Sequence, residues 1–93
     1  MVKCPKTAAE AFTRLDKRLT KEEKQQIVDS DEMFVFHFGL GMWIRNNWIY
    51  TGERENLESL MKDLGEPEFL SGDMASSAIL DAYQKHLKEI YGK

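Results

Sequence analysis

His37 and Arg45 are the residues best suited to chemistry in the apolar segment 33–48, and Gly41 lies midway between them. On a helix, residues four apart follow one another along one slowly turning stripe. The missing side chain at Gly41 would let a ligand or a packed ring approach the backbone closely. An imidazole and a guanidinium beside such a gap are suited to binding a carboxylate or another small anion.

Arg45 keeps its charge at every physiological pH, so a buried Arg45 needs a carboxylate or several carbonyl oxygens as partners. Asp73 and Asp81, in the last predicted helix, are the candidate partners, and Asp73 lies at the start of that helix. Two interpretations stay open. Either His37 and Arg45 fix the helix register through internal hydrogen bonds, or they bind a ligand beside Gly41 with Asp73.

Asn46 would add an amide group to this candidate ligand-binding site, and an indole ring of Trp43 or Trp48 would form its wall. The end of the same segment also resembles a protein-recognition surface, where aromatic and amide side chains are common. The candidate interaction surface comprises Trp43, Asn47, Trp48 and Tyr50. The alternative is that Trp48 and Tyr50 cap the hydrophobic core.

Motifs typical of enzymes are absent from the sequence. There is no phosphate-binding loop, no dinucleotide-binding glycine pattern, no nucleophile elbow and no paired-histidine zinc motif. Cys4 is the only cysteine and lies beside Pro5 near a terminus that we expect to be mobile, while His37 and His86 are far apart in sequence. This leaves too few ligands for a zinc site. We therefore expect no catalytic residue, no metal, no cofactor and no enzymatic activity.

The segment 33–48 is expected to form the central helix that positions these residues. At 100° per residue its apolar side chains surround the axis, which is typical of a helix buried on nearly all sides. It is too short for a membrane span, which needs about twenty residues. Its first half is also rich in residues that favour β-strands, but no second strand is predicted nearby.

Two helices are predicted before this segment. Thr7 and Thr20 each precede a glutamate by three positions, which is a capping-box pattern, so helices are expected over 8–18 and 21–29.

Two more helices are predicted after it. Apolar residues recur at helical spacing over 53–64, where Gly65 and Pro67 end the helix. The last helix reaches residue 91 with an apolar stripe of Ala75, Ile79, Leu80, Tyr83, Leu87, Ile90 and Tyr91. The expected fold class is all-α: residues 1–93 form a compact single-domain bundle of about five helices around the buried central helix 33–48.

The charge pattern restricts the partners. The net charge is -3, and the basic residues between Arg14 and Lys24 alternate with acidic ones, so nucleic acid is not an expected partner. A signal peptide is not apparent, and one cysteine does not require an oxidising compartment. We expect a cytoplasmic protein with no membrane partner, which binds another protein or a second copy of itself as a homodimer.

Residues 37–46, HFGLGMWIRN, resemble the signature of a family of small bacterial domains of unknown function. Residues 4–11, CPKTAAEA, and residues 73–80, DMASSAIL, are similar to further elements of that family. The chain departs from the pattern soon after Trp48, where the family has Gly-Leu-Trp. The resemblance implies a bacterial source and a fold that brings the central motif close to Asp73, and it implies no activity.

The sequence favours a non-catalytic protein–protein interaction module, which predicts an exposed apolar or acidic patch. The alternative is a small anion or carboxylate binder that uses His37, Arg45 and Asp73. That alternative predicts a concave pocket beside Gly41 with Arg45 reaching into it. It loses support if Arg45 pairs with an internal carboxylate and packed side chains cover Gly41.

Overall fold

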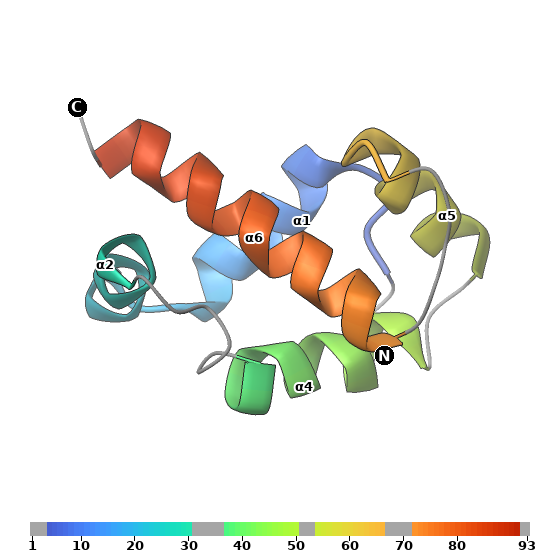
Figure 1. The fold of residues 1–93 in the computed structure, drawn as a ribbon, viewed down its shortest axis with the longest axis horizontal. Helices are drawn as coiled ribbons and strands as arrows, with labels where there is room; N and C mark the ends of the chain where they lie inside the picture. Colours follow the sequence, from blue (N-terminus) through green and yellow to red (C-terminus); the bar gives the residue numbers. More distant parts are fainter. Residues whose placement is uncertain (1–3, 31–36, 51–53, 67–71, 92–93) are drawn as a thin grey trace.

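Figure 1 shows the computed structural model, which describes residues 4–30, 37–50, 54–66 and 72–91. Within these ranges all regular structure is helical, so the all-α fold class is confirmed. The radius of gyration is 12.3 Å, the value expected of one compact domain of this length. The elements are α1 (Ala8–Arg18), α2 (Lys21–Asp29), η1 (His37–Gly41), α4 (Met42–Ile44), η2 (Arg45–Ile49), α5 (Arg54–Asp63) and α6 (Gly72–Tyr91).

The helices α1 and α2 begin where their caps predict. The Thr7 hydroxyl accepts a hydrogen bond from the Glu10 backbone N–H at 3.2 Å. Thr20 and Glu23 form a complete capping box, in which each side chain accepts from the backbone N–H of the other residue. These bonds satisfy backbone donors that have no partner within a helix, which is why the capping sequence determines the start of the helix.

The C-terminus of α5 is closed by a Schellman motif. Gly65 adopts a positive φ of 85°, which only glycine adopts at little cost. The Gly65 N–H donates to Lys62 O at 3.1 Å, and the Glu66 N–H donates to Met61 O at 2.9 Å. These two bonds satisfy carbonyls of the last turn, as the motif requires.

The N-terminal segment before α1 is held against one face of α5. Asn56 Nδ2 donates to Cys4 O at 3.1 Å, Ser59 Oγ donates to Lys6 O at 2.9 Å, and Asp63 accepts from the Ala8 N–H at 2.6 Å. Cys4 is buried. The expectation of a mobile terminus around Cys4 is therefore wrong for the described residues, because side chains far along the sequence supply its hydrogen bonds.

Among the described residues, α6 is the helix that contacts elements throughout the fold. It crosses the molecule and contacts α1, α2, η1 and η2 (Figure 1). Its buried side chains are those of Ala75, Ser76, Ile79, Leu80, Tyr83 and Leu87. Ile90 and Tyr91 are exposed, so the apolar stripe ends one turn earlier than predicted.

The helical segment 37–49 has one exposed face. Ile44 and Trp48 are buried, whereas Gly39, Met42 and Asn46 are exposed. The expectation of burial on nearly all sides is therefore wrong for this part of the segment, since the exposed residues recur at helical spacing. Residues 33–36 and the side chain of His37 lie outside the described part of the chain.

Two π-helical turns, η1 and η2, flank the short helix α4. In η2 the Tyr50 N–H donates to the carbonyl of Arg45, five residues earlier, at 2.8 Å. In an α-helix, residues five apart point about 140° away from each other. The wider π-turn brings such residues closer together, and Trp43 and Trp48 are five residues apart.

Candidate functional site

Arg45 joins η2 to the first turn of α6. Its side chain is only 14% exposed, and its Nη1 donates to Ser76 Oγ at 2.9 Å. The same nitrogen lies 3.4 Å from Asp73 Oδ1. Ser76 is buried, and its hydroxyl donates onward to Asp73 O at 3.0 Å. The guanidinium is therefore bonded to two groups of the same helical turn.

The pairing of Arg45 with Asp73 confirms the first-named candidate partner. The Asp73 side chain is 85% exposed, so solvent screens this ion pair and its contribution to stability is at most about 1 kcal/mol. The hydrogen bond to buried Ser76 is the stronger contact, because bonds from charged groups contribute about 1.5–3 kcal/mol.

The other members of the candidate ligand-binding site lie in different surroundings. Gly41 is buried within η1, and Asn46 is exposed on η2. The His37 side chain lies outside the described part of the chain. The structure thus brings together Arg45 and Asp73, and adds Ser76, which sequence reasoning missed.

The candidate interaction surface at the end of this segment is divided between core and solvent. Trp48 is fully buried, so it is core rather than surface, and its Nε1 is a buried donor without a described partner. Trp43 is half-buried and meets the Trp48 ring edge-on, with centroids 5.4 Å apart. Asn47 donates to the Trp43 carbonyl at 2.8 Å. Tyr50 remains exposed.

Arg18 of α1 covers the outer face of this tryptophan pair. Its guanidinium carbon lies 4.2 Å from the Trp43 ring centroid, which is a cation–π contact. This contact could not be predicted from the sequence, because it joins residues that are far apart in the chain. Trp43 is thereby packed between two neighbours, which supports a structural role for the ring.

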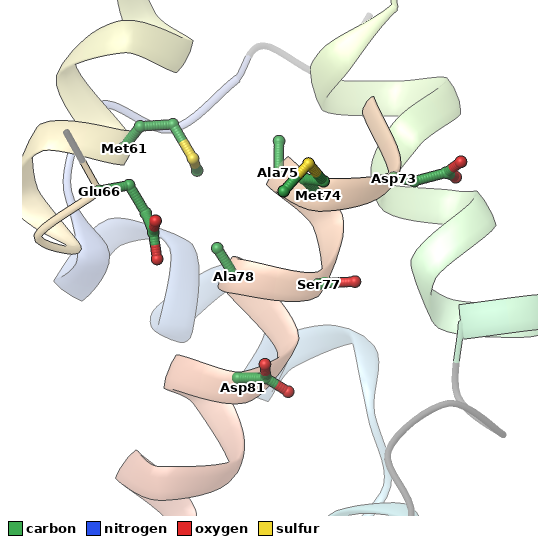
Figure 2. A pocket seen from close by; sticks show the side chains of 8 residues that line it. All are labelled: Met61, Glu66, Asp73, Met74, Ala75, Ser77, Ala78 and Asp81. Carbon is green, nitrogen blue, oxygen red and sulfur yellow. The ribbon is translucent and has the colours of Figure 1, made fainter. Parts of the chain in front are cut away.

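The cleft with the most distinctive chemistry lies between the end of α5 and the first half of α6. We call it the α5–α6 cleft, and its volume is about 390 Å³. Figure 2 shows Met61 and Glu66 on one side and the α6 residues on the other. The cleft is lined by Met61, Glu66, Asp73, Met74, Ala75, Ser77, Ala78 and Asp81.

The α5–α6 cleft combines an apolar floor with acidic edges. Met61, Ala75 and Ala78 provide the floor, and Met74 is 54% exposed beside it. The three charged residues that the structure describes in its lining all carry carboxylates. Among the described residues, no cation lies within ion-pair distance of Glu66 or Asp81. Sequence reasoning missed this cleft because Met61 has the spacing of a core residue and Met74 lies outside the predicted apolar stripe.

A second polar cluster joins α1, α2 and α6. The Tyr83 hydroxyl donates to Asp16 Oδ1 at 2.6 Å, and Lys24 Nζ lies 3.7 Å from the same carboxylate oxygen. Burial and then the hydrogen bond to Asp16 raise the pKa of Tyr83 well above its usual value. His86 stacks on Phe12, with ring centroids 4.5 Å apart. These contacts cross-link three helices and are typical of structural networks.

Comparison with known proteins assigns the chain to a family without a known activity. Residues 4–87 match a domain of unknown function, DUF6794. The chain belongs to this family. The DUF6794 match runs from the start of the described chain into the last turns of α6, so it includes Arg45, Ser76 and the α5–α6 cleft. No curated protein and no solved structure matches the chain.

Two further properties of the described residues bear on the DUF6794 domain. No helix among them is long and apolar enough to cross a membrane. No group of three or more metal-ligating side chains occurs within these ranges.

Proposed function

We propose that this DUF6794 domain is a non-catalytic interaction module that binds a partner protein in the α5–α6 cleft. The observation that supports this function is the exposed methionine Met74 beside the apolar floor of the cleft. Methionine side chains are flexible and polarisable, so they adapt to apolar groups of different shapes. A cleft of about 390 Å³ is within the usual size range of binding pockets.

The acidic edges of the cleft define the chemistry of the partner. Glu66, Asp73 and Asp81 line the cleft, and the Asp73 side chain points away from Met61 and Glu66 (Figure 2). Among the described residues only Asp73 has a cationic partner, Arg45. Complementary charge steers association and excludes acidic partners. The expected ligand is therefore a protein segment with an apolar side chain flanked by lysine or arginine.

The alternative, a small anion site at Arg45, has less support. Arg45 is already bonded to Ser76 and Asp73, and Gly41 is buried. A nucleic-acid partner is also disfavoured, because the net charge is -3 and the described cleft is acidic.

Selection from a displayed library of random short peptides on the immobilised full chain tests the proposal. We expect enrichment of peptides that combine lysine or arginine with a large apolar residue. Met74→Lys should abolish their binding, because it places a cation on the apolar floor. Met42→Lys is the matched control, since Met42 is also about half exposed but lies outside the cleft. Failure to enrich any peptide, or binding that survives Met74→Lys, would overturn the proposal.

A further inference from the structure

The last two turns of α6 carry basic and apolar side chains, which are the groups that we expect the α5–α6 cleft to bind. Lys85, Lys88 and Tyr91 are exposed and recur at three-residue spacing, which places them on one face of the helix. Tyr91 is 41% exposed next to Lys88, Ile90 is 54% exposed on another face of the same last turn, and Glu89 is exposed beside Lys85. We call Lys85, Lys88, Ile90 and Tyr91 the α6 tip. A tyrosine ring next to two ammonium groups, with an isoleucine in the same turn, is the expected complement of an apolar floor with acidic edges.

The α6 tip cannot enter the cleft of its own molecule. Met74 and Tyr91 belong to the same continuous helix, and seventeen residues of helix separate them by roughly 25 Å. Figure 1 shows the C-terminal end of α6 at the edge of the molecule, on the side opposite α5. Any contact between cleft and tip must therefore join two molecules.

We propose that the α5–α6 cleft binds the α6 tip of a second copy of this chain. This inference rests on the proposed function, because it names the partner of the same cleft. Tyr91 and Ile90 of one molecule cover the apolar floor beside Met74 of the next. Lys88 approaches the carboxylates of Glu66 and Asp81. The contact is head-to-tail, so it leaves one free cleft and one free tip at the ends of each assembly.

The charges in both surfaces are available for such a contact. Asp81 and Lys85 are four residues apart on α6, yet they form no ion pair in the described structure. Of the acidic residues of the cleft, Asp73 and Asp81 lie in the first half of α6, and Lys85 and Lys88 of the tip lie in its second half together with Glu89. This excess of acidic groups in one half of the helix and of basic groups in the other favours head-to-tail over side-by-side pairing.

The association should be weak and dependent on concentration. One helix end in a small cleft buries less surface than the 1,200 Å² or so of a stable interface. Salt should weaken the contact further, because its ion pairs are exposed. The free chain is therefore expected to be mostly monomeric when dilute and to form short chains when concentrated.

Sedimentation velocity of the full chain, measured from micromolar to millimolar concentration, tests the inference. The sedimentation coefficient of the wild type should rise with concentration. Met74→Lys, which damages the cleft, and Tyr91→Asp, which damages the tip, should each stay monomeric. Both positions are exposed, so both variants should stay folded, and circular dichroism checks this.

An equimolar mixture of the two variants gives the decisive result. The intact tip of Met74→Lys can enter the intact cleft of Tyr91→Asp, so the mixture should form dimers and nothing larger. Met42→Lys should associate like the wild type. Self-association without recovery in the mixture would overturn the head-to-tail contact.

The failures of the two proposals are distinguishable. A wild type that stays monomeric at every concentration, while its cleft binds displayed basic peptides, overturns the self-association and leaves the proposed function intact. A monomeric wild type that also enriches no peptide overturns both.

Discussion

Arg45 has a side chain that could bind an anion, but in this structure it bonds groups of the protein itself. Its guanidinium is mostly buried and bonded to the hydroxyl of Ser76, which is itself buried. An arginine in this setting cannot release its charge, so its neighbours must satisfy it. The arrangement fixes η2 against the first turn of α6 and thereby positions Asp73 at the edge of the α5–α6 cleft.

Arg45→Met should destabilise the protein by about 1–3 kcal/mol, because it removes a charge-assisted hydrogen bond from the buried Ser76 hydroxyl. The change in melting temperature measures this loss. Arg54→Met is the control, since the Arg54–Glu58 pair is exposed on both sides and should contribute less than about 1 kcal/mol. A melting temperature of Arg45→Met equal to or above that of the wild type would restore the anion-site interpretation.

Tyr83→Phe should lower stability near neutral pH by about 1 kcal/mol, because it removes the hydrogen bond to Asp16. Since the folded state raises the pKa of Tyr83, this contribution is complete below the unfolded tyrosine pKa of about 10 and declines above it. Urea unfolding at pH 8 and pH 11 should show the difference between wild type and variant shrinking at the higher pH. A difference that grows with pH would contradict the raised pKa.

The sequence predicted individual residue roles only where few partners were available. Arg45 needed a carboxylate, and Asp73 at the start of a helix was one of two candidates. The edge-on Trp43–Trp48 pair was not predictable, because it depends on a π-turn that has no sequence signal. The contact of Arg18 with Trp43 was equally hidden, since it depends on how α1 packs against α4.

At the scale of elements, helix ends were predictable because the signals that set them are local. The bounds of α1 and α2 agree with those expected from Thr7 and Thr20. Burial of whole elements was harder to predict. Counting apolar residues overestimated the burial of the segment 37–49, because Gly39, Met42 and Asn46 together form an exposed face.

Gly65→Ala should destabilise the protein by about 1 kcal/mol, because alanine is strained at the positive φ that closes α5. A Cβ at Gly65 meets no neighbour, so the backbone alone causes the loss. Gly39→Ala is the matched control. Gly39 is also open to solvent but lies in a helical turn without positive φ, so alanine should stabilise it by up to about 1 kcal/mol. Chemical denaturation of both variants measures these opposite signs, and equal effects would argue against the Schellman ending.

At the scale of the whole molecule, the central position of α6 depends on contacts that no local pattern encodes. Its apolar stripe was predicted correctly through Leu87, yet the stripe alone did not show that α1, α2, η1 and η2 all pack on it. The α5–α6 cleft likewise depends on tertiary structure, because its walls come from two successive helices and their relative placement is not encoded in either helix alone. The fold class and the helices were therefore predictable from local patterns, whereas the surface that carries the proposed function was not.

Two isoleucines of α6 test this division between core and surface along one helix. Ile79→Ala should cost about 2–5 kcal/mol, because Ile79 is fully buried where the helices meet. That loss corresponds to a fall in melting temperature of about 10 °C or more for a domain of this size.

Ile90→Ala should change the stability of the monomer by less than about 0.5 kcal/mol, since its side chain is exposed. The same Ile90→Ala variant should nevertheless weaken self-association in sedimentation velocity, because an apolar group of the α6 tip is lost. Similar losses of stability at both positions would show that the last turn of α6 belongs to the core and is not available to a second molecule.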